Sequence, residues 1–374
     1  MSGPGYKRLR AEPKRWRCDS QALPSGHLHS SIGTMHFGPD GRERFLTVPV
    51  PSGDRGTADA DPPTAVGLKC RVRQPGSTPM SERVSLVIVP VDGSSTAAAA
   101  TRHGAMLARL LGARLQLLHV MPLNPAELSD VPANRRIDAD HDRAQRLERA
   151  RRAFDRAREV IATPLDPSPE EVTLEDATFV RHPARAIVAH ARSQRDCLLV
   201  IGARHLSEMG KFVEGSVSNE VVHRANFPVT VVHAESAPEE VQRIGRILLP
   251  VDGSRHSDKA ATFAGELARS AGAGVELLFC RPATPAVAED ADGEAERIFR
   301  RARQVLGEVP EGVAERVLSG THYAEAIVDQ ARHSTDYPLI IMGRRGLSTW
   351  RERLLGGVSH RVIDLAPCPV TVVV

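Results

Sequence analysis

Two aspartates are the residues whose type and position could most directly do chemistry in this sequence. Asp92 and Asp252 each follow a short apolar run and open an Asp-Gly-Ser turn. A carboxylate at such a place can accept hydrogen bonds from the hydroxyl groups of a ligand. It can equally do no more than fix its own turn through nearby backbone N-H groups. For either aspartate alone, both interpretations stay open.

Two glycine-containing loops have a spacing that the chain repeats. One loop runs Gly202-Ala-Arg-His205, nine residues and Gly215-Ser216, and the other runs Gly343-Arg-Arg-Gly346, nine residues and Gly356-Gly357. Each loop leads into a helix-like stretch, and backbone N-H groups at a helix N-terminus are suited to phosphate. The repeated spacing therefore predicts phosphate binding. Ser216 would also be a favoured helix N-cap without any ligand, so it is weak evidence by itself.

The strands that must position these residues also repeat. Leu86–Ser94 matches Ile247–Ser254, Leu117–Val120 matches Leu277–Cys280, Leu198–Gly202 matches Leu339–Gly343, and Pro228–Val232 matches Pro369–Val373. The numbering of the first two pairs differs by 160, and that of the last two by 141. The first copy must therefore hold 19 extra residues between its second and fourth strands, and the proline-containing stretch Pro122–Asp140 is where we expect them.

The order of elements predicts the fold. Helix-like stretches separate the strands, with the clearest at Ala97–Leu111, Asp138–Ala162, His256–Ala271 and Val287–Leu306. The strands are continuous runs of Val, Ile and Leu, as expected when helices cover both faces of a parallel sheet. We therefore expect an α/β protein with two tandem Rossmann-like domains, each a doubly wound, five-stranded parallel sheet. Ligands of such sheets bind outside the carboxyl ends of the strands.

Composition limits the possible functions. Of the formal net charge of +3, residues 1–79 carry +5 and the remainder −2, which argues against a domain built to bind nucleic acid. No apolar run approaches the roughly 20 residues of a membrane-spanning helix. The five cysteines have no C-x-x-C spacing, which disfavours a zinc site or a disulfide framework and favours reduced thiols in the cytoplasm. The histidines show no H-E-x-x-H pattern, and we expect no metal site.

The domain boundaries follow from the repeats. Residues 1–79 lack apolar periodicity and are expected to be a disordered leader or, because Met80 precedes the first strand, a mis-annotated start. A basic interaction tail is the alternative. The first domain is expected at residues 80–236 and the second at residues 243–374. The last strands of the two domains, Pro228–Val232 and Pro369–Val373, could pair within one chain as an intramolecular pseudo-dimer, with a homodimer as a further alternative.

The paired Pro-Val-Asp-Gly-Ser openings, the Pro-Val-Thr-Val-Val endings and the loop spacing resemble the universal stress protein family over nearly all of residues 83–374. The resemblance implies a cytosolic stress-response protein that binds ATP, with magnesium, or a related adenine nucleotide. By it, Asp92 and Asp252 would face the ribose or base, Val120 and Cys280 would line the adenine slot, and the glycine loops would hold the phosphates.

Each copy departs from the full family pattern at one place. The first has His205 where a second glycine belongs, and the second has Gly357 in place of Ser or Thr. A histidine side chain can obstruct the loop, whereas Gly357 loses one hydroxyl but keeps its backbone N-H. The second copy is therefore expected to be the better site. Its additional phosphate ligands would be Arg344, Arg345 and Ser359, although the arginines could be no more than solvated loop charges.

No catalytic constellation accompanies the loops. The sequence has no Gly-x-x-x-x-Gly-Lys-Ser/Thr loop and no Gly-x-Ser-x-Gly elbow. We therefore expect a regulator that binds nucleotide and passes its bound state to a protein partner. The first alternative is an interaction scaffold that binds no nucleotide, and the second is a slow ATPase.

Overall fold

The computed structural model describes eight stretches of the chain. They are residues 84–121, 135–175, 182–203, 217–236, 243–281, 291–334, 336–346 and 356–374, with side chains from residue 143 in the second stretch and 293 in the sixth. The expected leader, residues 1–79, lies outside the described residues. The elements of the first copy are β1 (Leu86–Pro90), α1 (Ser95–Leu111), β2 (Arg114–Val120), α2 (Arg135–Glu159), β3 (Glu170–Leu174), α3 (Pro183–Ser193), β4 (Cys197–Ala203), α4 (Val217–Arg224) and β5 (Val229–His233).

The second copy repeats the same order of elements. They are β6 (Arg246–Pro250), α5 (Arg255–Ala271), β7 (Gly274–Arg281), α6 (Ala291–Leu306), β8 (Val313–Ser319), α7 (Tyr323–His333), β9 (Pro338–Gly343), α8 (Gly357–Leu365) and β10 (Val370–Val373). A short 3-10 turn, Ala234–Ser236, ends the first copy.

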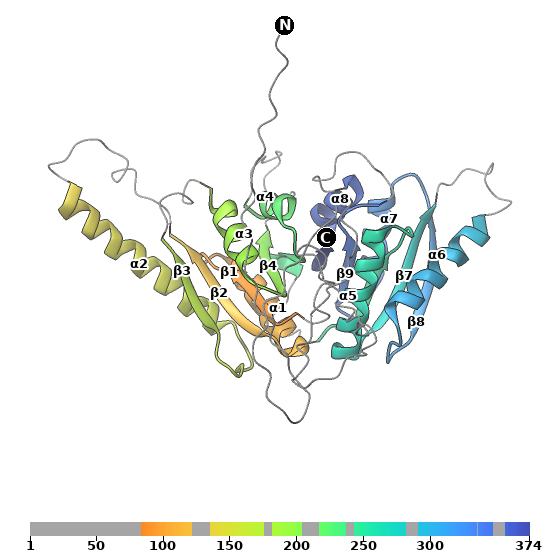
Figure 1. Cartoon of the computed structure of the whole chain (residues 1–374), viewed down its shortest axis with the longest axis horizontal. Coiled ribbons are helices and arrows are strands. Elements are labelled where there is room, and N and C mark those ends of the chain that lie inside the picture. The colour runs from red at the N-terminus through yellow and green to blue at the C-terminus, as the bar shows by residue number, and fades with distance from the viewer. Residues whose placement is uncertain are drawn as a thin grey trace, which may run out of the picture. The chain divides into compact units, whose positions relative to one another are not determined.

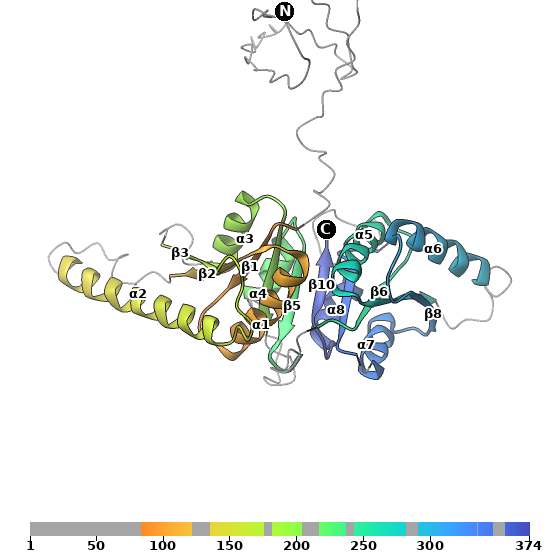
Figure 2. The ribbon, with the colours of Figure 1, turned by 90° about the horizontal axis from the view of Figure 1, so that it is seen from below.

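The strands form one ten-stranded sheet in the order β3-β2-β1-β4-β5-β10-β9-β6-β7-β8. Within each copy all neighbouring strands are parallel, with β1 and β6 in the middle of their halves. The two halves meet where β5 and β10 pair antiparallel, with Thr230 opposite Thr371 (Figures 1 and 2). The expected doubly wound sheets and the pairing of the last strands within one chain are both confirmed.

Helices cover both faces of the sheet, and the inner strands therefore bury both sets of their side chains, whereas the edge strands β3 and β8 are largely exposed or half-buried. Val87 and Val89 of β1 point into the core beneath α1, α2, α5 and α6. Leu86 and Ile88, which alternate with them, point into the core beneath α3, α4, α7 and α8. Burial on both faces explains why the strands are continuous apolar runs.

The Asp-Gly-Ser turns connect β1 to α1 and β6 to α5 in the same way. Gly93 and Gly253 have φ of 81° and 75°, a left-handed conformation that glycine adopts without steric penalty. Ser94 and Ser254 then cap the helices, and each hydroxyl accepts a hydrogen bond of 3.2 Å from the backbone N-H three residues on. The turns therefore place both aspartates at the carboxyl end of a central strand and beside a helix N-terminus.

The extra residues of the first copy lie mainly before Phe154. This ring meets His119 edge-on, and Phe299 meets Phe279 in the same way, so Phe154 and Phe299 occupy equivalent places. The difference in numbering between the copies thus falls from 160 at the end of β2 to 145 at Phe154, which accounts for 15 of the 19 extra residues. Part of this length is helical, since α2 has 25 residues and α6 has 16.

Candidate functional site

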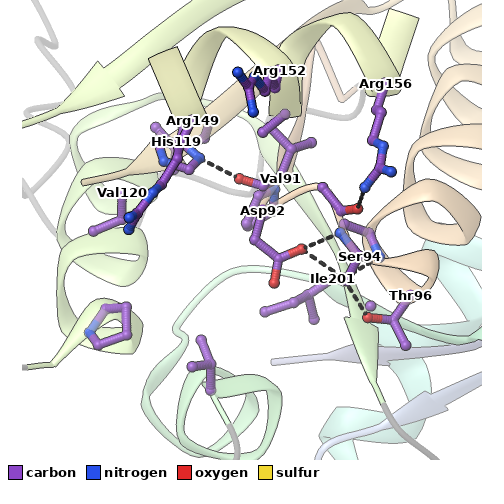
Figure 3. Close-up of a pocket in the computed structure, with 18 of the residues that line it drawn as sticks. Val91, Asp92, Ser94, Thr96, His119, Val120, Arg149, Arg152, Arg156 and Ile201 are labelled. Carbon is purple, nitrogen blue, oxygen red and sulfur yellow. Dashed lines mark hydrogen bonds between the residues drawn. The ribbon is translucent and has the colours of Figure 1, made fainter. Parts of the chain in front are cut away.

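A cavity of about 840 Å³ opens in the first copy at the carboxyl ends of β1, β2 and β4, and one wall is formed by α2 (Figure 3). Asp92, Val120 and Gly202, three of the residues that the sequence predicted to bind a nucleotide, all line it. Its volume is within the range of about 300–1,000 Å³ typical of small-molecule sites. The parallel strand order brings these residues together, because β1 lies between β2 and β4.

Asp92 is exposed within this site. Its Oδ1 atom accepts hydrogen bonds from the Ser94 backbone N-H at 2.9 Å and from the Ser94 hydroxyl at 2.6 Å. The carboxylate therefore fixes its own turn, as one interpretation of the sequence held. All of these hydrogen bonds reach Oδ1, and Figure 3 shows the second carboxylate oxygen turned toward the cavity. Asp92 can therefore fix its own turn through Oδ1 and still accept hydrogen bonds from a ligand through its other oxygen.

The floor of the cavity is held in place by His119, which the sequence did not assign to the site. Its ring is buried, and its Nδ1 atom lies 2.7 Å from the backbone oxygen of Val91. This hydrogen bond joins the ends of β1 and β2. It also sets the position of Val120, the half-buried residue that follows. The ring of Phe154 from α2 lies edge-on to His119 at a centroid distance of 6.1 Å and connects the floor to the helical wall.

Four arginines of α2 line the same cavity and were also missed by the sequence analysis: Arg146, Arg149, Arg152 and Arg156. Their spacing of three or four residues places them on one helix face. Arg156 donates a 2.8 Å hydrogen bond from Nη1 to the backbone oxygen of Gly93. The spacing could have identified this face, but only packing shows that it turns toward Asp92.

Gly202 has a packing role of its own. A Cβ atom at this position would lie 2.3 Å from the backbone oxygen of Thr96 in the first turn of α1. Gly343 is held in the same way in the second copy, where a Cβ atom would lie 2.7 Å from the carbonyl carbon of His256 in α5. Close approach of strand and helix therefore requires both glycines. Gly215, Ser216 and His205 lie outside the described residues.

In the second copy, Asp252 is half-buried beside Gly346. Its Oδ1 atom accepts a 3.0 Å hydrogen bond from the Ser254 backbone N-H, and a Cβ atom on Gly346 would lie 2.4 Å from Oδ2. The structure thus brings these two predicted residues into direct contact. Cys280 lies at the end of the neighbouring strand β7, where burial raises the pKa of its thiol to about 11.

The remaining predicted residues of the second copy stabilise local structure. Gly356 donates a 2.9 Å hydrogen bond to the backbone oxygen of Arg344, and the buried Ser359 hydroxyl donates at 3.1 Å to that of Gly343. Gly357 begins α8. The buried Arg344 guanidinium donates to the backbone oxygens at the end of α4, those of Ala225 at 2.6 Å and of His223. Its side chain therefore joins the two copies, which makes it an interface residue.

Arg345 is half-buried beside His256. Burial lowers the pKa of this histidine, and the positive charges of Lys259 and Arg345 lower it further. No group of three or more potential metal-binding side chains occurs within the described stretches. Among the helices in those stretches, none is long and apolar enough to cross a membrane.

The fold and the site define a tandem α/β protein of the doubly wound class, with a ligand-sized cavity at the strand ends of its first copy. The model of the universal stress protein family matches residues 85–233 and again residues 243–374. The chain belongs to this family. The repeated matches agree with the tandem organisation of the sheet.

Three universal stress proteins match this chain over nearly their whole length. A universal stress protein of Mycolicibacterium smegmatis is 27% identical over 294 residues, which cover 77% of this chain and 96% of that protein. The universal stress protein Rv2623 of Mycobacterium tuberculosis is also 27% identical, over 76% of this chain and 95% of its own. The crystal structure of a universal stress protein from Archaeoglobus fulgidus matches with a TM-score of 0.51 and 21% identity, covering 78% of this chain and 98% of that one.

Proposed function

We propose that this protein is a stress-response regulator whose first copy binds an adenine nucleotide. The observation that supports this most directly is the cavity of about 840 Å³ that Asp92, Val120 and Gly202 line together. The second copy was expected to be the better site because its loop keeps three glycines. Its Asp252 carboxylate lies against Gly346, whereas Asp92 is exposed to its cavity, and this difference favours the first copy.

The residues around this cavity suit an adenine nucleotide. The exposed Asp92 carboxylate is an acceptor for the two hydroxyl groups of a ribose. Val120 offers an apolar strand end to the base, and the N-terminus of α1 favours negative charge nearby. Magnesium would accompany the phosphates of ATP. We propose that the bound nucleotide alters contacts with a protein partner, as a regulatory ligand does.

One observation favours the alternative of a scaffold that binds no nucleotide. Gly202 is required by its contact with Thr96 whether or not a ligand is present, so this glycine alone does not indicate phosphate. The two hypotheses differ in one measurable property, which is the affinity of the purified chain for ATP.

The experiment is calorimetric titration of the full chain with ATP and magnesium, using two matched variants. Asp92→Asn keeps an acceptor for the turn but removes the carboxylate charge, and Asp252→Asn makes the same change in the second copy. We expect Asp92→Asn to weaken binding by about 1.5–3 kcal/mol, the contribution of a hydrogen bond to a charged group. Asp252→Asn should leave the affinity within a factor of about two.

Three results would contradict the proposal in different ways. A flat titration with the wild-type chain, together with no nucleotide released from the purified protein in mass spectrometry, would support the scaffold. A larger loss of ATP affinity with Asp252→Asn than with Asp92→Asn would support a site in the second copy. Release of ADP faster than in a blank would support the slow ATPase.

A further inference from the structure

The arginine row, defined as Arg146, Arg149, Arg152 and Arg156 of α2, is the feature of the cavity that the family pattern does not account for. All four side chains line the cavity. Figure 3 shows Arg149 extending from α2 to the side of Val120 and Arg156 extending to the Asp-Gly-Ser turn. Guanidinium groups offer planar pairs of N-H donors that match the oxygens of phosphate. The row therefore gives the site an anion-binding wall.

The ion pairs of Asp155 and Glu148 do not neutralise the exposed arginines of the row. Asp155 forms its ion pairs with Arg158 and, at 3.9 Å, with Arg151, neither of which lines the cavity. Arg152 has Glu148 at 3.1 Å, but its side chain remains 74% exposed. Ion pairs of such exposure contribute little and exchange readily for a stronger anion. The exposed guanidinium groups of Arg149, Arg152 and Arg156 are therefore accessible to a phosphorylated ligand.

The second copy keeps only two of the four arginines. With Phe154 and Phe299 as equivalents, Arg146 and Arg149 correspond to Ala291 and Glu294. Arg301, the counterpart of Arg156, is held by Asp258 of α5 through hydrogen bonds of 3.0 Å and 2.5 Å. The first turn of α1 has no acidic residue that could hold Arg156 in this way. The complete positive wall is therefore a property of the first copy alone.

The arginine row and Gly202 belong to elements on opposite sides of β1. Helix α2 packs against β2, whereas Gly202 belongs to β4, and β1 separates these two strands in the sheet. A ligand whose phosphates lay on α2 would therefore be oriented toward β2 and away from Gly202. This separation makes the two candidate anion sites distinguishable by mutation.

We infer that the arginine row binds the phosphate groups of the ligand and makes the first copy selective for phosphorylated over neutral compounds. The inference rests on the proposed function for the adenosine part of the ligand but not for the anionic part. Because Arg149, Arg152 and Arg156 are exposed, binding decreases with ionic strength. Several arginines act together, since each exposed contact is weak alone.

The test uses two charge reversals on the same helix of the full chain. Arg149→Glu places in α2 the residue type that the second copy has at Glu294, and Arg151→Glu makes an equal charge change outside the cavity lining. The ligands for calorimetry are tripolyphosphate, ATP and adenosine. Both arginines lie on the surface of α2, and thermal melts check that both variants fold.

We expect the wild-type chain to bind tripolyphosphate, and to bind ATP about tenfold or more tightly than adenosine. Arg149→Glu should weaken tripolyphosphate binding about tenfold and abolish the preference for ATP, whereas Arg151→Glu should change either by less than about threefold. Equal losses in the two variants, or no binding of tripolyphosphate to the wild-type chain, would overturn the inference.

The outcomes separate this inference from the proposed function. If ATP binding depends on Asp92 but not on Arg149, the first copy binds an adenine nucleotide and the inferred role of the arginine row is wrong. If tripolyphosphate binding depends on Arg149 but ATP binds no more tightly than tripolyphosphate, the arginine row binds phosphate and the proposal of an adenine-nucleotide ligand is wrong.

Discussion

At the scale of single residues, two glycines of the second copy's loop differ in what they do. Gly343 lies against the backbone of α5, whereas Gly357 begins α8 with nothing within 4 Å of an added Cβ atom. A residue chosen for its place in a phosphate-binding pattern can therefore be explained by packing. Whether such a glycine is required by packing depends on contacts between β9 and α5, which the sequence around the glycine does not reveal.

These two glycines give a matched prediction of stability. Gly343→Ala should lower the free energy of unfolding by about 1–3 kcal/mol, because the new methyl group would overlap the backbone of His256. Gly357→Ala should leave it unchanged or raise it by up to about 1 kcal/mol, because alanine restricts the unfolded chain. Urea unfolding monitored by circular dichroism measures both. Equal destabilisation by the two substitutions would contradict the packing role of Gly343.

A second residue-scale prediction concerns pH. His103 of α1 is buried, neither ring nitrogen has a hydrogen-bond partner among the described residues, and burial lowers its pKa to about 3. The unfolded chain, with a histidine pKa near 6.5, therefore binds the proton more readily than the folded chain. The contribution of His103 to the free energy of unfolding is therefore fully present above pH 6.5. Between pH 6.5 and pH 3 the free energy of unfolding falls by up to about 1.4 kcal/mol per pH unit.

The second copy suggests the variant that tests this pH dependence. Phe263 occupies the place of His103 in the repeat and is also buried. His103→Phe should flatten the decline in unfolding free energy between pH 6.5 and pH 4.5, and it should raise stability at the lower pH. Urea unfolding at a series of pH values provides the measurement. Parallel curves for the wild-type chain and the variant would exclude His103 as the source.

At the scale of the elements, the sequence predicted type and order well because the two copies constrain each other. The helix expected at Ala97–Leu111 is Ser95–Leu111, and the one expected at Asp138–Ala162 is Arg135–Glu159. Apolar periodicity identifies such helices, and their ends depend on capping and on the last hydrogen bonds. The extra residues were assigned to Pro122–Asp140, of which residues 122–134 lie outside the described residues, and α2, which begins at Arg135 within this stretch, is nine residues longer than α6.

The candidate site was less predictable than the elements that carry it. Asp92 and Gly202 follow from the rule that strand ends meet at one edge of a parallel sheet, and Val120 was implied by the family resemblance. The arginine row required a further fact, namely that buried Ala150, Ala153 and Phe154 turn one face of α2 toward the sheet. This tertiary contact leaves the arginines at the cavity, and no local pattern around Asp92 encodes it.

At the scale of the whole molecule, the two copies are joined by an interface with pseudo-twofold symmetry. Thr230 and Thr371, which occupy equivalent places in the two copies, face each other across the antiparallel pair of β5 and β10. Arg344 reaches the end of α4, and Nε2 of His233 lies 2.8 Å from the backbone oxygen of Ile363. This pairing covers one edge of each five-stranded sheet, edges that would otherwise present unpaired N-H and C=O groups.

The threonine pair allows a direct test of this interface in solution. Both side chains are fully buried, and their hydroxyl oxygens lie 2.8 Å apart. Thr371→Val should lower the free energy of unfolding by about 1–2 kcal/mol, because valine has a similar shape but leaves the Thr230 hydroxyl without its partner. Thr230→Val should have a similar effect. The double variant should be close to the wild type, because no hydroxyl is then left unpaired.

Urea unfolding of the four proteins gives the coupling energy between the two positions. Since residues far apart in a structure have nearly additive effects, a coupling of about 1 kcal/mol or more requires β5 and β10 to lie together in the folded chain. Additive losses in the double variant would contradict the pairing of the two halves. The coupling should also be independent of protein concentration, because both strands belong to one chain.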